Sequence, residues 1–244
     1  MANSYFQFKQ FLVHQDRCAM KVTTDGCLFG AWVAEQLKSG NKEVKKLLDI
    51  GAGTGLLSLM VAQANSAIKL DAIEIDKDAF EQAKENIANS SWNSRISIFY
   101  GDAKEFSSPY LYDVIISNPP FYEKELKSEN SKKNKAHHDE GLLLDDLLSI
   151  IKKNLAPGGE FYLLQPFKRK EAVDIAFAKN ELAISHITFV RQSTQHHYFR
   201  IMISGKHSAN KEGPSTTTEL TIRDEKQEYM PGFIRLLKDY YLHL

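Results

Sequence analysis

Cysteine is scarce in this chain, which has two, Cys18 and Cys27, among 244 residues. Small secreted domains held together by disulfides carry more, and structural zinc sites need four ligands at characteristic spacings. Although nine residues apart and close enough to be bridged, the two are predicted to be reduced packing residues of a cytoplasmic protein. The histidine pairs at 137–138 and 196–197 lack an accompanying ligand spacing, so we predict no metal centre.

Long apolar runs and an excess of either charge are also missing. No stretch approaches the roughly 18 apolar residues that cross a bilayer, and the amino terminus lacks the basic-then-apolar order of a secretory signal. Lysine and arginine total 31, as do aspartate and glutamate, so the formal net charge is zero. Contacts to nucleic acid must therefore come from local clusters of charge rather than from the whole chain.

The most informative stretch present is Asn118-Pro119-Pro120-Phe121, which follows the apolar run 113–117. Such a run predicts a buried parallel strand, and ligands bind at the carboxyl ends of these strands in open α/β sheets. The prolines remove two backbone donors, which leaves an amide side chain, free carbonyls and an aromatic ring side by side. This combination favours a planar substrate with an exocyclic NH2 group, although a structural Asn-Pro-Pro turn is an equally common use.

A glycine-rich turn upstream favours the substrate-binding interpretation of the Asn-Pro-Pro turn over the structural one. The apolar run ending at Ile50 predicts a strand and 54–64 predicts a helix, and between them the chain reads Asp49-Ile-Gly51-Ala-Gly53-Thr-Gly55. The spacing does not match the dinucleotide fingerprint, and the lysine of a phosphate-binding loop is missing. An acid before the turn would repel a pyrophosphate but attract an ammonium group. We therefore expect a ligand with an amino acid moiety, such as S-adenosylmethionine.

Two further strand ends carry acids. The strand 69–74 ends in Glu74, which can accept both hydroxyls of a ribose; Asp76 could do the same, but its position favours a helix N-cap. Ile75 would flank an adenine ring. The strand 95–100 is followed by Gly101-Asp102-Ala103, where Asp102 can accept from the adenine amino group or serve as a simple turn acid.

The carboxyl-terminal third of the chain predicts further elements of the same domain. The segments 182–190 and 197–204 are predicted to be antiparallel strands, and the polar segment 206–218 is predicted to be a connecting loop. Residues 231–243 predict a terminal helix, whose aromatic stripe favours the core over a base-stacking surface.

Together these strand ends resemble the class I S-adenosylmethionine-dependent methyltransferases that act on planar amino groups. The amino-terminal block 6–26 and the carboxyl-terminal segment 220–244 further resemble the bacterial tRNA1(Val) (adenine(37)-N6)-methyltransferase family. The resemblance implies one α/β Rossmann-like domain, with a mostly parallel seven-stranded sheet, an antiparallel terminal strand and helices on both faces. It also implies a division into an extension, 1–40, that packs on a catalytic domain, 41–244.

The resemblance also implies which residues form the functional site, because each matches a position of the family's motifs. It implies catalysis by residues 118–121 and a cofactor site formed by Thr24, Asp25, Asp49, Gly51, Gly53, Gly55, Glu74, Ile75, Asp102 and Ala103. The chain departs from the family where Phe121 replaces a frequent tyrosine, and where His137 follows Ala136 in place of an expected arginine. The implied reaction is N6-methylation of adenine 37 in tRNA1(Val).

Two lysine-rich segments are candidates for RNA contact. The polar stretch 123–138 follows the Asn-Pro-Pro turn and contains Lys132, Lys133 and Lys135, while Lys168 and Arg169 follow the predicted strand 161–167. Both would lie at the carboxyl edge of the sheet, where they could contact tRNA phosphates. A mobile solvated loop is the competing interpretation of the first segment.

Three other functions share part of this pattern. Release-factor glutamine methyltransferases use the same turn on a planar amide but have a long helical domain before the glycine turn, where this chain has 48 residues before Asp49. A guanine-N2 methyltransferase of ribosomal RNA would use the same turn. A non-catalytic S-adenosylmethionine-binding protein would have no need to retain Asn118 and both prolines.

Overall fold

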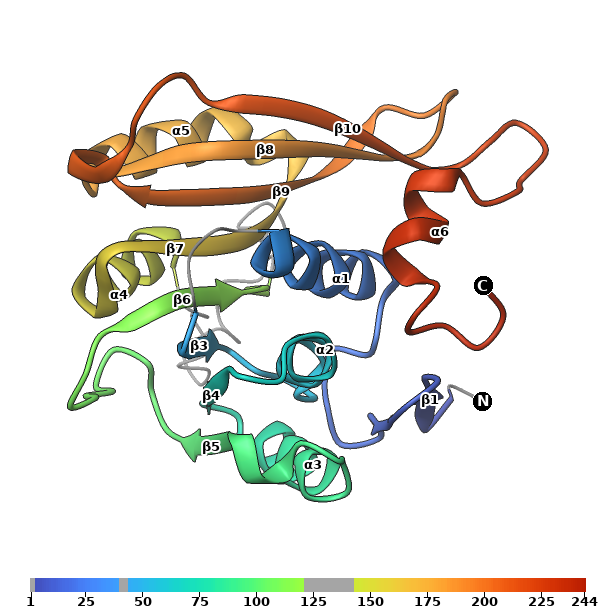
Figure 1. The fold of residues 1–244 in the computed structure, drawn as a ribbon, viewed down its shortest axis with the longest axis horizontal. Coiled ribbons are helices and arrows are strands. Elements are labelled where there is room, and N and C mark those ends of the chain that lie inside the picture. The colour runs from blue at the N-terminus through green and yellow to red at the C-terminus, as the bar shows by residue number, and fades with distance from the viewer. Residues whose placement is uncertain (1–2, 40–43, 121–142) are drawn as a thin grey trace, which may run out of the picture.

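The computed structural model describes residues 3–39, 44–120 and 143–244. Its centre is one twisted, mostly parallel sheet (Figure 1). In spatial order its eight strands are β10 (Thr216–Arg223), β8 (Leu182–Ser193), β9 (Tyr198–His207), β7 (Leu155–Pro166), β6 (Tyr112–Ser117), β3 (Lys46–Ile50), β4 (Lys69–Glu74) and β5 (Ile96–Tyr100). A separate hairpin joins β1 (Tyr5–Gln7) to β2 (Leu12–His14).

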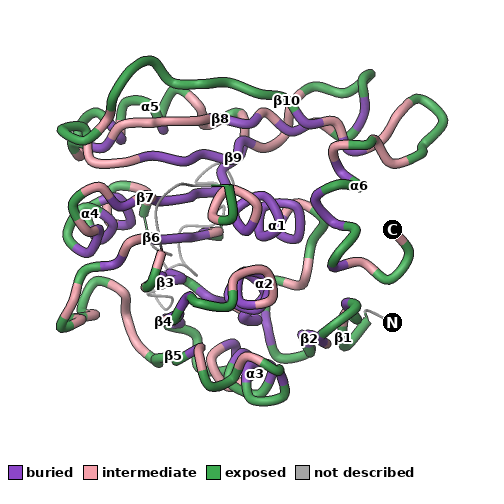
Figure 2. Tube along the Cα trace, viewed as in Figure 1, coloured by how far each residue is buried: buried purple, intermediate pink, exposed green. Residues whose placement is uncertain are grey.

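Helices cover both faces of the sheet and divide the apolar interior in two. One face carries α1 (Thr24–Ser39), α2 (Leu56–Ala64), α3 (Lys77–Ala88) and the short α6 (Pro231–Leu237); the other carries α4 (Leu144–Asn154) and α5 (Lys170–Lys179). Short 3-10 turns are η1 (Asn93–Arg95), η3 (Phe167–Arg169) and η4 (Ser208–Asn210). In Figure 2 the central strands β6, β7 and β9 are largely buried, whereas most of β10 is exposed. The predicted α/β fold with helices on both faces is confirmed.

The number of strands predicted from the sequence was wrong by one. The polar and turn-forming residues of the segment 206–218 predict a connecting loop, but β10 begins at Thr216 and pairs in parallel with β8. Its threonines are β-branched and suit a half-exposed edge strand. Thr216 and Thr218 also contact His186 of β8 through their hydroxyls, at 2.7 and 2.9 Å. Pairing with a neighbour, rather than local sequence, therefore creates this strand.

The antiparallel pairing predicted for the segments 182–190 and 197–204 is confirmed. The strand β9 is antiparallel to both β8 and β7, while every other pair in the sheet is parallel. The four-residue connection 194–197 explains the reversal, since parallel neighbours need a longer crossover.

The last helix is shorter than predicted. It ends at Leu237, not at His243, and the amides of Tyr240 and Tyr241 both donate to the Leu237 carbonyl in a tight turn. The Tyr240 hydroxyl then reaches the Met60 carbonyl of α2 at 3.0 Å. Phe233 and Tyr240 are buried, so the aromatic stripe is part of the core, as predicted.

The amino-terminal part of the chain contributes to the same core. The helix α1 packs along α2 and contacts α6, and its residues Cys27 to Ala34 are buried. Both cysteines are free and buried, as predicted. Within the described residues no helix is long and apolar enough to cross a membrane, and no group of three metal-ligating side chains occurs.

Candidate functional site

The carboxyl ends of four adjacent parallel strands bring the predicted cofactor and catalytic residues to one edge. The strands β6, β3, β4 and β5 lie side by side in register. Their ends lead into Asn118, the glycine turn, Glu74 and Asp102 respectively. The Ser117 hydroxyl donates to the Ile50 carbonyl at 2.7 Å, which joins the end of β6 to the start of the glycine turn. We call this edge of the sheet the rim.

The glycine turn exposes bare backbone at the rim. Gly51 and Gly53 have φ angles of 74° and 55°, a region that side chains disfavour. Apart from the two chain neighbours of each glycine, no described residue has an atom within 4 Å of the position that a Cβ would take. Gly55 differs, because a Cβ there would lie 3.5 Å from Ala83 of α3. The first two glycines therefore leave room for a ligand, while the third permits α3 to pack closely.

Asp49 lies beneath this turn and is fully buried. Its Oδ2 accepts from the Ser58 hydroxyl at 2.7 Å, and its Oδ1 has no partner among the described residues. Burial raises the pKa of Asp49 to about 7, the Ser58 hydrogen bond opposes that shift, and the nearby Glu74 carboxylate adds to it. A cationic group at the turn would stabilise the ionised form of this carboxyl.

Glu74 is oriented by backbone amides. Its Oε2 accepts from Gly53 at 2.7 Å and its Oε1 accepts from Asp76 at 2.9 Å. A carboxylate oxygen has two lone pairs, so each can accept a further bond from a ligand. Asp76 caps α3 through a bond from the Ala79 amide, as predicted. Ile75, between them, is 62% exposed and presents an apolar surface at the rim.

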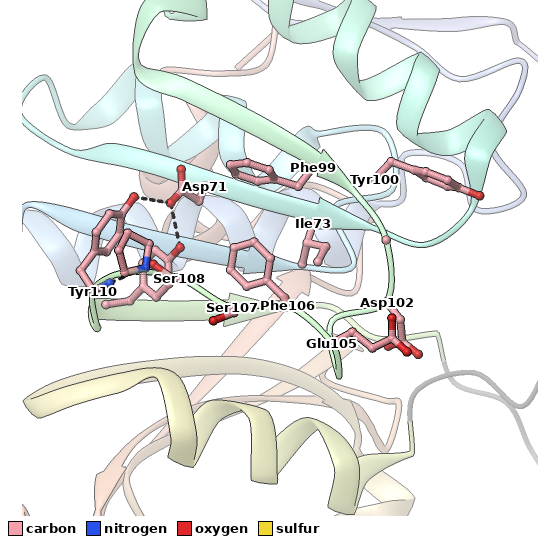
Figure 3. Close-up of a pocket in the computed structure, with 13 residues that line it drawn as sticks. Asp71, Ile73, Phe99, Tyr100, Asp102, Glu105, Phe106, Ser107, Ser108 and Tyr110 are labelled. Carbon is pink, nitrogen blue, oxygen red and sulfur yellow. Dashed lines mark hydrogen bonds between the residues drawn. The ribbon is translucent and has the colours of Figure 1, made fainter.

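Asp102 lies at the mouth of a cavity of about 470 Å³ on the α4 side of the sheet. Figure 3 shows Asp102 and Glu105 at one end, with Phe99, Phe106 and Ile73 along the cavity. At the other end the hydroxyls of Tyr110 and Tyr112 both donate to Asp71, at 2.6 and 2.7 Å. Ile75 and Ala103 do not line this cavity, although Ala103 follows Asp102 in the same turn. The cavity therefore reaches from the rim down the face of the sheet.

Asn118 has a buried oxygen without a partner. Its Oδ1 has almost no solvent contact and no hydrogen bond within the described residues. Pro119 is buried and Pro120 is exposed, so the turn leaves the sheet at this point. Phe121 lies outside the described residues. A buried acceptor without a partner is destabilising, which makes Asn118 a candidate to accept a hydrogen bond from a ligand.

The first turn of α1 lies against Asn118. A Cβ added at Gly26 would be 3.7 Å from the Asn118 Nδ2 and 3.7 Å from Leu56 of α2. Thr24, which is exposed, and Asp25 precede Gly26. The end of the amino-terminal block at Gly26 therefore lies beside Asn118 and beside Leu56, which follows the glycine turn. A cofactor contact by Thr24 or Asp25 stays a prediction.

The partner of Asp25 could not be found from the sequence. The Arg200 Nε of β9 donates to the Asp25 Oδ2 at 2.7 Å, with both side chains mostly buried. This ion pair ties α1 to the end of β7, whose Pro166 is paired with Arg200. The two residues are 175 positions apart and no local pattern links them; the single indication was a basic residue inside a predicted strand.

The predicted RNA contacts divide into two groups. Lys168 and Arg169 lie in η3, directly after the end of β7, and thus at the rim where the sequence placed them. Lys132, Lys133 and Lys135 lie outside the described residues, as do Ala136 and the histidines 137 and 138. The role of both groups in binding stays a prediction.

Comparisons with known proteins identify the family. The methyltransferase small domain family matches residues 31–169. A tRNA1(Val) (adenine(37)-N6)-methyltransferase of Phocaeicola vulgatus is 40% identical over 244 residues, which cover 100% of both chains.

Solved structures agree at the level of the fold. A predicted O-methyltransferase from Agrobacterium tumefaciens superimposes with a TM-score of 0.65 at 16% identity, over 88% of this chain and 96% of the other. A putative class I S-adenosylmethionine-dependent methyltransferase from Listeria monocytogenes gives 0.60 at 18% identity, over 85% and 67%. The fold is that of a class I methyltransferase, and the chain belongs to the tRNA1(Val) (adenine(37)-N6)-methyltransferase family.

Proposed function

We propose that this protein transfers the methyl group of S-adenosylmethionine to N6 of adenine 37, beside the anticodon of tRNA1(Val). The observation that carries the proposal is the buried, unpartnered Oδ1 of Asn118, at the end of β6 and beside the glycine turn. An exocyclic amino group would supply the missing donor. The full-length similarity to enzymes named for this reaction supports the choice of substrate.

The residues at the rim fit S-adenosylmethionine. The open space over Gly51 and Gly53 admits a ligand against bare backbone, and the unpartnered Oδ1 of Asp49 offers an acceptor for an ammonium group. Glu74 would accept from the ribose hydroxyls, and Asp102 from the adenine amino group, with Ile75 and Ala103 flanking the ring. When bound, the cofactor supplies an electrophilic methyl group.

Asn118 would act on the amino group of the substrate. The N6 lone pair of adenine is delocalised into the ring and is a poor nucleophile. An amide oxygen and the Pro119 carbonyl that accept the two N6 hydrogens stabilise the more pyramidal nitrogen as charge develops there. Phe121 would stack on the base and Pro120 would keep the turn rigid. A base in a loop is already unpaired, so its extrusion costs less than from a duplex.

The remaining expectations belong to the same proposal. Residues 1–40 would form an extension on the catalytic domain 41–244, and would bring Thr24 and Asp25 to the methionine end of the cofactor. Lys132, Lys133, Lys135, Lys168 and Arg169 would contact tRNA phosphates. A tRNA substrate and two free cysteines are consistent with a cytoplasmic enzyme.

Methyl transfer from labelled S-adenosylmethionine tests the proposal. The protein is incubated in parallel with tRNA from cells lacking this modification, with ribosomes, and with release factor. We expect label in tRNA alone, recovered as N6-methyladenosine after digestion. Label in a glutamine side chain or in ribosomal guanine would contradict the proposal and assign the site to another planar amine.

A further inference from the structure

A group of three aromatic rings lies at the far end of the rim, beyond the predicted catalytic turn. The ring centroids of Phe167, Phe189 and Tyr198 are 5.2 to 5.6 Å apart. Each ring comes from a different element: η3 after β7, the strand β8, and the first residue of β9. All three are partly exposed. We call these three residues the aromatic trio.

A β-bulge aims Tyr198 at this position. Val190 of β8 is paired with Arg200, but the next residue, Arg191, is paired with Tyr198, so Phe199 is an extra residue in β9. Without it, Tyr198 and Arg200 would point to the same face, and Arg200 points to Asp25 of α1. The bulge turns Tyr198 to the opposite face, beside Phe189. Bulges beside functional sites commonly re-aim a side chain in this way.

Within the trio, Phe167 and Phe189 form the base and Tyr198 the outer member. Both phenylalanines pack against the apolar cluster beneath α4 and α5. The planes of Phe189 and Tyr198 are inclined by 33°. A hydrogen bond to the Glu219 carboxylate raises the pKa of Tyr198. The trio is thus an aromatic surface that its two phenylalanines anchor to the core.

Cations border the trio. The Arg191 guanidinium lies 5.6 Å from the centre of the Tyr198 ring and is paired with Glu219 at 3.5 Å. Lys168 and Arg169 follow Phe167 directly in η3. Arg191 and its partner Glu219 therefore lie beside the trio, and two more basic residues follow Phe167 in the same turn. Rings that accept stacked bases beside cations that contact phosphates are how proteins hold single-stranded RNA.

The trio lies within reach of a nucleotide bound at Asn118. Tyr198 is two strands away from β6, about 10 Å across the sheet, and about four residues further along, or about 13 Å. The combined separation of about 16 Å equals about five stacked nucleotides at about 3.4 Å each, or fewer in an extended strand. One loop of RNA could therefore occupy both positions.

We propose that the aromatic trio is a stacking site for an unpaired nucleotide of the substrate RNA, in the anticodon loop that presents the target adenine. This inference rests on the proposed function, and it adds a binding position that neither the glycine turn nor the Asn-Pro-Pro turn provides. The trio would fix the loop at a second point and so set which base reaches Asn118.

Two substitutions at Tyr198 provide a matched test. Tyr198→Leu keeps an apolar side chain but removes the ring, whereas Tyr198→Phe keeps the ring and removes the hydroxyl. Affinity for tRNA is measured by filter binding with S-adenosylhomocysteine present, and methyl transfer is measured alongside. We expect Tyr198→Leu to weaken tRNA binding and raise KM for tRNA about tenfold, with kcat at saturating tRNA and cofactor affinity unchanged. Tyr198→Phe should retain wild-type affinity.

Phe167→Leu is a second test should Tyr198→Leu fold poorly, and it should weaken tRNA binding in the same direction. The inference is overturned if wild-type protein methylates tRNA and both leucine variants, folded by circular dichroism, bind tRNA as tightly as wild type. An equal loss in Tyr198→Phe would also overturn it, because the hydroxyl and not the ring would then matter. Wild-type protein that leaves tRNA unlabelled would instead refute the proposed function itself, and the trio with it.

Discussion

The two halves of the rim are built differently. In the glycine-turn half, comprising β3, β4 and α2, the side chains and amides of the site lie within 28 consecutive residues, from Asp49 to Asp76. In the far half, comprising β7, β9 and β8, an ion pair and an aromatic trio join residues from distant parts of the chain. The difference teaches that most of the proposed cofactor site lies in one continuous segment, whereas the proposed RNA-binding surface is assembled by the pairing of distant strands.

Asn118, between these halves, gives the sharpest test of the comparison. Asn118→Ala should lower kcat by about a hundredfold to a thousandfold, the range seen when one aligned donor or acceptor of a transition state is removed. Affinity for S-adenosylhomocysteine and for tRNA should stay within about twofold of wild type. Single-turnover methyl transfer and two binding titrations measure these quantities. Asn210→Ala, at an exposed turn remote from the rim, is the matched control and should be silent.

Weaker cofactor binding in Asn118→Ala would contradict the prediction that Asn118 contacts the substrate and not the cofactor. It would mean that the carboxamide belongs to the glycine-turn half and supports the cofactor instead of the substrate amine. Unchanged kcat would remove Asn118 from the reaction altogether.

Much of the glycine-turn half could be predicted from the sequence, because its chemistry is local. The strand–turn–helix order, the Asp76 cap and the acid at the end of β4 each follow from neighbouring residues. The far half could not be predicted, since β10 forms by pairing with β8 and Arg200 meets Asp25 from 175 positions away. Tyr198 also faces the trio through a bulge, and a period-two pattern cannot show one extra residue.

Alanine substitutions at Gly51 and at Gly213 should distinguish a loss of cofactor affinity from a loss of folding stability. Gly51→Ala places a methyl group in the open space at the turn, so S-adenosylhomocysteine affinity should fall about tenfold to a hundredfold. Its positive φ adds about 1 kcal/mol of strain. Gly213→Ala has the same kind of φ, 69°, and the same open surroundings in a remote loop. Calorimetric titration should therefore show normal binding for Gly213→Ala, with a similar loss in melting temperature for both variants.

The lysines that follow the Asn-Pro-Pro turn in the sequence are predicted to show the opposite pattern, with a loss of RNA affinity and no loss of cofactor affinity. Changing Lys132, Lys133 and Lys135 together to alanine should weaken tRNA binding about tenfold and leave cofactor affinity unchanged. For every phosphate that is no longer neutralised, the slope of log K against log salt should become shallower by about 0.7 for single-stranded RNA. Filter binding from about 50 to about 300 mM salt, the range where such slopes are resolved, measures this. An unchanged slope would assign these lysines to solvent alone.

Cofactor affinity, which depends on the glycine-turn half, should change with pH, whereas tRNA affinity should not. Burial raises the pKa of Asp49 to about 7, so its ionised form, which would attract the cofactor ammonium, is populated above that value. Affinity for S-adenosylhomocysteine should rise about threefold to tenfold between about pH 6 and pH 8, and this rise should vanish in Asp49→Asn. Affinity for tRNA should show no matching step.

The raised pKa of Asp49 should also make the stability of the ligand-free protein depend on pH, in the opposite direction to cofactor affinity. A carboxyl whose folded pKa is raised favours folding at pH values below its unfolded pKa, near 4, and loses that contribution as pH rises through about 7. Wild-type protein should therefore lose up to about 1.4 kcal/mol per pH unit across this window, relative to Asp49→Asn. Melting temperatures at about pH 5 and pH 8 give the comparison. If the two proteins lost stability in parallel, the Asp49 carboxyl would be ionised throughout, and its unpartnered Oδ1 would have to be stabilised by a donor that is present without the cofactor.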